Sequence, residues 1–245
     1  MNEISDLDNE SIYLHKSRWA VTIKNGSIIR KRFLHLNTAK ICKEVSLLRL
    51  SSEMEINLIF DVNSLEWYYE MPYLDLYPFY IYDNQQAIFT QLHKIFNTWN
   101  SDERYCRLTK NEWHTINMPY YFEILKRYFP NNYGITSYLS KLTADHFIHG
   151  DFTTSNVYYD QSGRIIVLDY ENATVGPYKW DESTLAYSFI ENMSYDMAQK
   201  LIYEFQCPKQ MLLAIAAIRL AQIRRKHGND ADRYRAYLYI LENLN

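Results

Sequence analysis

The segment 149–171 reads HGDFTTSNVYYDQSGRIIVLDYE and combines conspicuous polar residues with short apolar runs. Asp151 and Asn156 are separated by four residues, and Asp169 ends the apolar run RIIVLD. The residues 161–163 predict a tight turn between two short strands. We expect this hairpin to bring four oxygen-bearing side chains together: Asp151, Asn156, Asp169 and Glu171.

These oxygen atoms match the requirements of phosphoryl transfer from ATP. Asp151 fits the role of the carboxylate that orients and deprotonates the acceptor hydroxyl. Asn156 and Asp169 fit the role of ligands for Mg²⁺, which neutralises the phosphate oxygens. Glu171 follows in a strand-like segment, so we expect it to share the side of Asp169 and to join the metal shell. The alternative is a capped turn, in which Asp151 and Asn156 bond their own backbone.

Composition excludes several other classes of protein. A chain of 245 residues that is 47% hydrophobic can bury a sizeable core as one large domain or two lobes. The formal net charge of −3 argues against a general nucleic-acid binder. The motifs GxGxxG, GxxxxGK[ST], HExxH and GxSxG are absent, which disfavours P-loop, dinucleotide-binding, zinc-protease and serine-hydrolase readings.

Three sequence features bear on the cellular compartment. Cys42, Cys106 and Cys207 form no CxxC pair and no disulfide framework, so a reducing compartment is expected. The polar, acidic N-terminal residues do not resemble a signal peptide. The longest strongly apolar stretch, 211–218, is too short to span a bilayer. We expect a cytoplasmic protein without a transmembrane segment, and a peripheral membrane contact stays open.

Hydrophobic periodicity divides the chain into a β-rich first part and a helical second part. Asn25-Gly26 is a strong hairpin signal, because both residues tolerate positive φ. The predicted strands are 11–14, 19–24, 27–33, 56–60 and 66–74, with one helix at 37–50. The predicted helices of the second part are 84–99, 119–129, 134–142, 181–193, 194–205, 208–226 and 230–244. We therefore expect an α+β fold with two lobes and a ligand site in the cleft between them.

The order of β-rich lobe, HGDxxxxN at 149–156, hairpin and LDYE at 168–171 resembles the aminoglycoside phosphotransferase and choline kinase family. These enzymes are small-molecule relatives of the protein kinases, which carry H-R-D-x-x-x-x-N and then D-F-G. Here Gly150 replaces the arginine, and Tyr170-Glu171 replace Phe-Gly. Both differences favour the small-molecule branch over protein kinases. The resemblance covers about residues 12–190 and extends, more weakly, to kinases of bacterial surface-polysaccharide pathways.

The resemblance implies a kinase-like bilobal fold, ATP and Mg²⁺. It implies a nucleotide-binding lobe at 1–75, with a hinge near 70–74, and a helical lobe at 76–245 with the catalytic loop and the acceptor site. Lys31 is the expected lysine of the third strand that holds the phosphates, with Arg30 or Arg32 in its place if the register slips by one. The other nucleotide-binding residues that the resemblance implies are Glu44 as the helix partner of Lys31, and the hinge backbone of Glu70, Met71 and Tyr73.

Further residues follow from the same resemblance. Asp181 is expected to open a helix and to brace the catalytic loop, and His149 is expected to buttress that loop. The phosphate-covering loop corresponds to 14–19, which contains no glycine, so Lys16, Ser17 or Arg18 would contact phosphates by side chain. The basic helix end, with Arg219, Arg224, Arg225 and Lys226, either contacts an acidic acceptor or a membrane, or is a solvated helix end; we favour the solvated end.

The leading hypothesis is an ATP-dependent kinase that acts on a hydroxyl of a small molecule or glycan, with a sugar or polysaccharide acceptor favoured. The alternatives are a pseudokinase-type module that binds nucleotide or protein without chemistry, and a protein serine/threonine kinase. The oligomeric state is not readable from the sequence.

Overall fold

A computed structural model describes residues 11–16, 20–33, 38–52, 54–79, 85–129, 133–227 and 231–244, with side chains for all of them except 11–16, 85, 133, 226 and 227. Contacts divide the chain into two compact units. Unit 1 consists of Met1–Tyr77 and Tyr159–Glu171, and unit 2 consists of Pro78–Tyr158 and Asn172–Asn245. The predicted boundary at 75/76 assigned the segment 159–171 to the second domain, whereas its contacts group it with the first unit.

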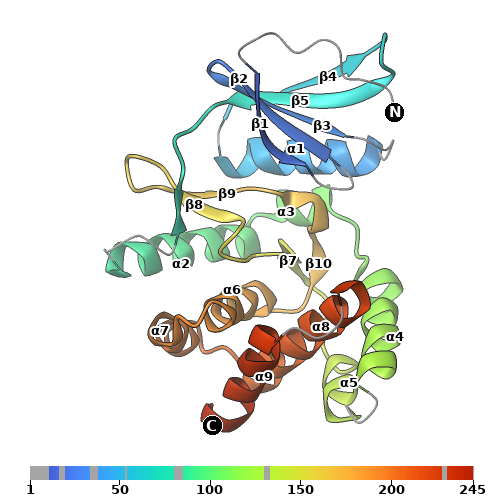
Figure 1. Ribbon diagram of the computed structural model, residues 1–245, viewed down its shortest axis with the longest axis vertical. Helices are drawn as coiled ribbons and strands as arrows, with labels where there is room; N and C mark the ends of the chain where they lie inside the picture. The colour runs from blue at the N-terminus through green and yellow to red at the C-terminus, as the bar shows by residue number, and fades with distance from the viewer. Residues whose placement is uncertain are drawn as a thin grey trace. The chain divides into compact units, whose positions relative to one another are not determined.

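Unit 1 contains an antiparallel five-stranded sheet in the order β1-β2-β3-β5-β4, with the helix α1 beside it (Figure 1). Asn25 and Gly26 (φ +57°) make the predicted turn between β2 and β3. In α1, Ile41, Val45 and Leu48 form the buried face at helical spacing. The elements are β1 (Ser11–Lys16), β2 (Ala20–Asn25), β3 (Ile28–Phe33), α1 (Thr38–Ser52), β4 (Asn57–Asp61) and β5 (Glu66–Pro72).

The second segment of unit 1 brings the motif LDYE beside α1. β9 (Ile165–Val167) is buried along its whole length and packs against α1. The rings of Tyr77 and Tyr159 stack at 5.3 Å, which holds this segment to the first one. β6 is Tyr77–Pro78, and β8 is Val157–Tyr159.

Glu171 does not lie in a strand. Tyr170–Asn172 forms a single turn of 3₁₀ helix directly after Asp169, so the strand alternation that we expected for Asp169 and Glu171 is wrong. Tyr170 is fully buried in this turn, and Glu171 is only partly exposed. The chain therefore turns directly after Asp169 instead of extending.

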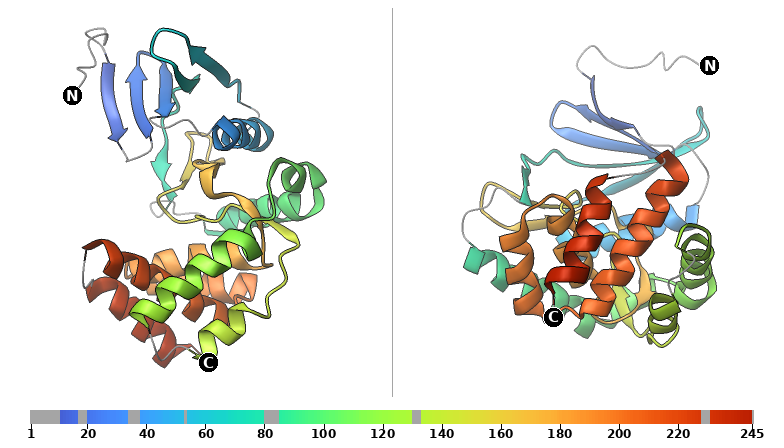
Figure 2. Two further views of the ribbon diagram at one scale, coloured as in Figure 1. Left: turned by 90° about the vertical axis from the view of Figure 1, so that its right-hand side faces the viewer. Right: turned by 60° about the horizontal axis from the view of Figure 1, so that its bottom comes forward.

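Unit 2 is built mainly of helices. α6 is its central helix, because every residue from Trp180 to Ile190 is buried. Figure 2 shows α4, α8 and α9 side by side, in agreement with their packing contacts. The helices are α2 (Gln85–Ser101), α3 (Glu103–Leu108), a π-helix (Trp113–Asn117), α4 (Met118–Tyr128), α5 (Tyr133–Leu139), α6 (Trp180–Glu191), α7 (Tyr195–Phe205), α8 (Lys209–His227) and α9 (Ala231–Asn243).

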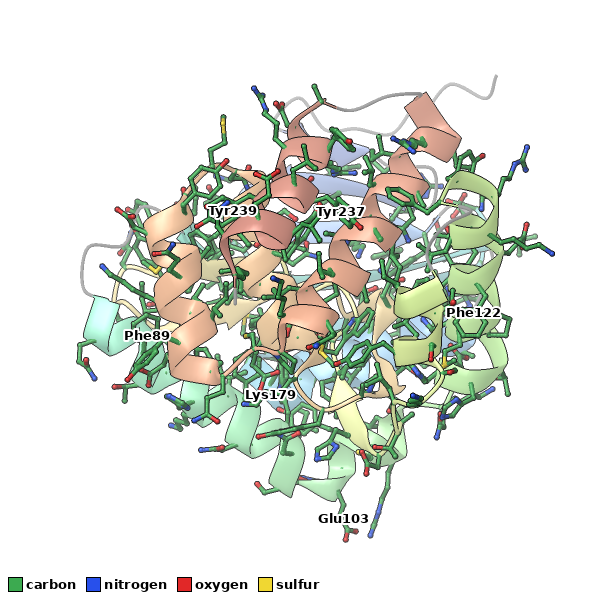
Figure 3. All side chains as sticks on the ribbon, turned by 90° about the horizontal axis from the view of Figure 1, so that it is seen from below. Phe89, Glu103, Phe122, Lys179, Tyr237 and Tyr239 are labelled. Atoms are coloured by element: carbon green, nitrogen blue, oxygen red, sulfur yellow. The ribbon has the colours of Figure 1, made fainter. Side chains whose placement is uncertain are left out.

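Two tyrosines of α9 pack against aromatic rings of other segments. Tyr237 and Tyr239, both labelled in Figure 3, are two positions apart, so they leave opposite sides of the helix. Tyr239 stacks on Tyr195 of α7 at 4.2 Å, and Tyr237 packs against Phe129 at 5.6 Å. Among the described residues, no helix is both long and apolar enough to cross a membrane.

The predicted helices of the second part and the five strands of the first part are confirmed within a few residues at their ends. The sequence reading missed α3, the π-helix and a two-stranded antiparallel sheet of β7 (His146–Ile148) and β10 (Thr174–Gly176). Strands of three residues are too short to produce a period-two pattern that can be recognised.

Candidate active site

Lys31 is the centre of a charged cluster in unit 1. Its Nζ lies 2.7 Å from Oε1 of Glu44 on α1 and 2.8 Å from Oδ1 of Asp169, which follows β9. The Tyr69 hydroxyl on β5 donates a further hydrogen bond of 3.1 Å to the same Glu44 oxygen. Two segments more than 130 residues apart in sequence are therefore joined through one ammonium group.

The register of β3 explains why Lys31 occupies this position. Lys31 is paired with Thr22 on β2 and with Tyr69 on β5. Its neighbours Arg30 and Arg32 alternate to the other face of the sheet, where they form ion pairs with Glu70 and Glu66 of β5. Of the three basic residues that the sequence offered, Lys31 is the one that contacts Glu44 and Asp169.

Burial and neighbouring charges shift the pKa values of Lys31 and Glu44 in opposite directions. Burial by itself would lower the pKa of Lys31, but Glu44, Tyr69 and Asp169 together raise it well above its usual value. Burial raises the pKa of Glu44, and the charge of Lys31 only partly offsets this. The Glu44 side chain is 0% exposed, so its ionised form depends on Lys31.

The same cluster offers oxygen ligands for a cation. One carboxylate oxygen each of Glu44, Asp169 and Glu171 lies within 4.8 Å of the others. Carboxylate oxygens are the ligands that Mg²⁺ and Ca²⁺ prefer. Asp169 has a left-handed backbone (φ +67°), which is uncommon for a residue other than glycine and is found mostly where the surrounding structure imposes it. These donors fit a divalent cation, with Asp169 and Glu171 as the predicted ligands and Glu44 beside them.

The predicted hinge residues belong to the end of β5 and the residues after it. Glu70 pairs with both neighbouring strands, and its side chain lies 2.6 Å from Arg30. Met71 is buried. The Tyr73 N–H donates to the carbonyl of Ser27 at 2.7 Å, so this donor is used within unit 1. The adenine-binding role of Glu70, Met71 and Tyr73 stays a prediction.

Side chains are not described for the three residues expected to contact the phosphates of ATP. Ser17 and Arg18 lie outside the described residues, and Lys16 is described only by its backbone.

In unit 2, the loop after β7 carries the HGD motif and is held by α6. Both oxygens of the Asp181 carboxylate accept backbone hydrogen bonds from this loop, from His149 N at 2.5 Å and from Gly150 N at 3.1 Å. Ser188, two turns further along α6, accepts a third from Thr154 N at 3.2 Å. The geometry agrees with the bracing role that the sequence predicted for Asp181.

His149 is completely buried and packs against Trp99, with ring centroids 6.2 Å apart. Its Nδ1 accepts a hydrogen bond of 3.3 Å from the backbone N–H of Asp151, so the ring proton lies on Nε2 in this arrangement. These contacts match the structural role that we expected for His149.

Gly150 is required by its backbone conformation and by its surroundings. Its φ is +81°, and a Cβ atom there would overlap the carbonyl oxygen of Asn172 and lie 3.1 Å from its carbonyl carbon. We expect Gly150→Ala to lower the free energy of unfolding by about 2–4 kcal/mol, because positive-φ strain and overpacking add. Urea denaturation measures this. Gly134→Ala is the matched control, because nothing lies within 4 Å of that position; an equal loss in both variants would contradict the prediction.

Asp181 should make stability depend on pH. Burial raises the pKa of Asp181 to about 8, although the N–H groups of His149 and Gly150 oppose this. The unfolded carboxylate releases its proton at lower pH than the folded one, so the free energy of unfolding should fall as the pH rises from about 4 to 8. Urea denaturation at several pH values should show a smaller fall for Asp181→Asn. Glu182 has a pKa raised by burial too, so some slope should remain. An equal fall in the free energy of unfolding with pH in the native protein and in Asp181→Asn would refute the raised pKa of Asp181.

Asp151 contacts both Asn156 and an arginine of α8. The Asn156 amide donates to the Asp151 carbonyl at 2.8 Å and to its carboxylate at 3.3 Å. A guanidinium N–H of Arg219 donates to the other carboxylate oxygen. Burial by itself would raise the pKa of Asp151, but the charge and hydrogen bond of Arg219 hold it below its usual value. The group is therefore ionised and able to orient a hydroxyl.

Asp151 and Arg219 line a cavity of about 250 Å³ within unit 2. Its walls come from the π-helix, α4, α6 and α8, and most of them are aromatic, aliphatic or amide side chains, among them Tyr121 and Trp180. Asp151 and Arg219 are the charged residues of this lining, as far as the described part of the chain extends. A cavity that combines apolar walls with convergent polar groups is a common place for a small-molecule site.

Arg219 was not predicted as a site residue. The favoured prediction, that Arg219 belongs to a solvated helix end, is wrong, because three quarters of its side chain is buried and it pairs with Asp151. The guanidinium groups of Arg224 and Arg225 lie over the rings of Phe129 and Tyr120 at 5.0 and 5.7 Å, and Arg225 is exposed. The available signal was an arginine one turn after Ile215, on an otherwise apolar helix face.

The predicted site residues thus form two groups. Unit 1 brings together Lys31, Glu44, Asp169 and Glu171, and unit 2 brings together Asp151 and Asn156. The expectation that all four polar residues of the hairpin segment converge stays a prediction, and so do the roles of these side chains.

No protein-family model and no curated protein matches the sequence. Solved structures do match: choline kinase LicA from Streptococcus pneumoniae aligns over 94% of this chain and 91% of its own, at 14% identity and a TM-score of 0.60. Amicoumacin kinase hAmiN, solved with AMP-PNP and Ca²⁺, aligns over 96% of this chain and 87% of its own, at 13% identity and a TM-score of 0.61. The chain has the fold of these small-molecule kinases. The kinase-like fold that the resemblance implied is therefore confirmed.

A third match extends the same fold to antibiotic-modifying proteins. A thermostable mutant of aminoglycoside phosphotransferase APH(4)-Ia, in a complex with AMP-PNP and hygromycin B, aligns over 97% of this chain and 95% of its own, at 11% identity and a TM-score of 0.61. At these identities the likeness establishes the kinase-like fold, and the substrate has to be argued from the chain's own residues.

Proposed function

We propose that the chain transfers the γ-phosphoryl group of ATP to a hydroxyl group of a small molecule or a glycan. The observation that carries this proposal is Lys31, held between Glu44 and Asp169 by hydrogen bonds of 2.7 and 2.8 Å. A buried lysine that is paired with a helix glutamate and followed by a metal-binding aspartate is the phosphate-binding arrangement of kinases. The second support is Asp151, at the wall of a cavity large enough for part of a small molecule.

Each described residue has a distinct task in this proposal. Lys31 binds phosphate oxygens of ATP, and Glu44 holds Lys31 in position. Asp169, Glu171 and Asn156 would hold Mg²⁺, which would neutralise phosphate charge. Divalent-cation binding at this fold is supported by the Ca²⁺ in the amicoumacin kinase complex. Glu70, Met71 and Tyr73 are proposed to contact adenine.

Asp151 orients the acceptor hydroxyl and accepts its proton. The acceptor oxygen forms a bond to the γ-phosphorus while the bond from this phosphorus to the β-phosphate bridging oxygen breaks, so that ADP is released. Arg219 and Asn156 fix the Asp151 carboxylate through hydrogen bonds on both of its oxygens. A carboxylate fixed in this way loses little freedom when the hydroxyl binds.

A sugar or glycan acceptor, including an end group of a surface polysaccharide, is favoured over an aminoglycoside. An aminoglycoside carries several ammonium groups and would need acidic partners. The cavity lining offers Asp151 and no second carboxylate among the described residues. A cytoplasmic location would supply the ATP for this reaction and agrees with three cysteines that form no disulfide framework.

The proposal is tested by transfer of label from γ-labelled ATP with Mg²⁺ to a panel of sugars, polysaccharide fragments, choline, ethanolamine and aminoglycosides. We expect label in one class of acceptor, and none when EDTA removes the metal. Label in generic protein substrates instead would favour a protein kinase. ATP binding without transfer to any acceptor would favour a pseudokinase-type binding module.

One observation favours the binding module as the second candidate. Arg219 holds the pKa of the proposed base, Asp151, below its usual value, and a carboxylate with a lowered pKa is a weaker proton acceptor. Single-turnover measurements separate the two candidates, because a binding module would retain the labelled ATP unchanged.

A further inference from the structure

We propose that the acceptor carries an anionic group, a carboxylate or a phosphate, close to the hydroxyl that is phosphorylated, and that Arg219 binds this group. This inference rests on the proposed phosphotransfer. It assigns the charge class of the acceptor, and it makes Arg219 a substrate-binding residue of α8.

The charges of the cavity lining favour an anionic acceptor. Arg219 and Asp151 are its charged residues, and they form an ion pair, so the described lining has no net charge. A cationic acceptor such as choline would meet a guanidinium group and a carboxylate that is already paired. An anionic acceptor would meet a guanidinium group that has unused donors.

Arg219 has more N–H donors than its contact with Asp151 uses. A guanidinium group has five N–H groups in a planar fork that suits carboxylate and phosphate oxygens. Among the described residues, the Asp151 carboxylate is the acceptor that Arg219 contacts, through Nη2. A quarter of the Arg219 side chain is exposed, so water reaches the remaining N–H groups and a ligand in the cavity can replace this water with acceptor oxygens. An anion in the cavity would do so without displacing Arg219 from α8.

Amide groups lie beside Arg219 in the cavity lining. Asn117 and Gln222 belong to this lining, and their side-chain amides can donate to oxygens. Donors therefore come from both α8 and the π-helix, while Asp151 is the carboxylate that opposes them among the described lining residues.

Binding of the acceptor anion has a consequence for Asp151. Arg219 would share its charge between the two carboxylates or between the carboxylate and a phosphate, so its hold on Asp151 would weaken when the acceptor arrives. The proton acceptor would then become available only when a suitable substrate is present. This resolves the conflict between the Arg219–Asp151 ion pair and the proposed role of Asp151 as a base.

The competing interpretation is that Arg219 only fastens α8 to the catalytic loop. In that case, its loss would reduce turnover with every acceptor by the same factor. The two interpretations are distinguished by acceptors that differ in one substituent: glucuronate and glucose 6-phosphate are anionic, glucose is neutral and glucosamine is cationic. Glycerol 3-phosphate and glycerol form a second, smaller pair.

The experiment measures kcat/KM for these acceptors, and their binding by calorimetry to protein saturated with AMP-PNP and Mg²⁺, which blocks the nucleotide site. We expect an anionic member of a pair to exceed its neutral counterpart by about tenfold or more. Arg219→Gln should remove most of this preference, and Arg219→Lys should retain part of it. Raising the salt concentration should also reduce it.

Arg219→Gln removes the partner of Asp151 and can impair folding, so a second variant keeps the ion pair intact. Gln222→Glu adds a carboxylate to the cavity from the same helix. It should weaken binding of the anionic probes by about tenfold more than it weakens binding of glucose. Circular dichroism and urea denaturation confirm that the variants are folded.

The outcomes separate this inference from the proposed function. Transfer that prefers neutral or cationic acceptors, with an equal loss for all of them in Arg219→Gln, overturns the inference and leaves phosphotransfer standing. If nothing is phosphorylated, the proposed function fails. The calorimetry then still decides whether the AMP-PNP-loaded protein binds anions through Arg219, and equal binding to native protein and Gln222→Glu rejects it.

Discussion

Asp151→Asn is expected to slow phosphoryl transfer by about 10²–10⁴-fold, the range of a lost general base. The asparagine side chain keeps the size of the aspartate but cannot accept the hydroxyl proton. It also cannot pair with the charge of Arg219, which is three quarters buried. The rate constant is best measured in single turnovers with saturating labelled ATP and the acceptor found in the panel, so that slow binding does not hide the chemical step.

The control for this variant is Asp196→Asn. Asp196 lies in the first turn of α7, away from the cavity lining. We expect its rate to stay within about twofold of the native rate, since surface substitutions usually change little. Native-like turnover in Asp151→Asn, with Asp196→Asn unchanged, would remove Asp151 from the mechanism.

Lys31→Met is expected to lower the free energy of unfolding by about 3–5 kcal/mol and to abolish detectable ATP binding. The stability loss arises because Glu44, with no exposed side-chain surface, is left as a buried carboxylate without its partner cation. The negative charge of Asp169 would then repel the ionised Glu44 carboxylate. Urea denaturation and calorimetric titration with ATP and Mg²⁺ measure the two effects separately.

A double variant distinguishes the structural from the functional role of this lysine. Lys31→Met with Glu44→Leu replaces the ion pair by apolar groups, so much of the stability should return. ATP binding should not return, because no cation reaches the phosphates. Lys24→Met on β2 is the control, since Lys24 lies over the Tyr73 ring at 3.5 Å and its loss should cost less than about 1 kcal/mol. ATP affinity restored by the double variant would contradict a phosphate-binding Lys31.

Most of the fold was predictable because its elements are long enough to carry a period. The alternation of side chains along β3 predicts that Lys31 lies on one face of the sheet and that Arg30 and Arg32 lie on the other. The structure shows this arrangement. β7 and β10 were not predictable, since they have three residues each and no turn signal joins them, whereas the turn at 161–163 marked the equally short β8 and β9. No local signal predicted the 3₁₀ turn at Tyr170–Asn172, in which Tyr170 is fully buried.

The candidate site was predictable where a motif fixes the spacing, as for Asp151 and Asn156. Arg219 was not, because its partner lies 68 residues away and no motif connects them. The general preference of arginine for the surface pointed in the wrong direction here. The apolar face around Arg219 was the better guide, since a charge on such a face must find a partner inside the protein.

Each unit consists of two separate segments of the chain, and this determines when each unit can fold during synthesis and which fragments can fold. A ribosome releases the first stretch of unit 1, with Lys31 and Glu44, long before the stretch that carries Asp169. Unit 1 can reach its final arrangement only after the segment Tyr159–Glu171 has emerged, when much of unit 2 has already been made. A nascent chain therefore holds Lys31 and Glu44 without Asp169, and a fragment ending at Tyr77 would never complete this charged cluster.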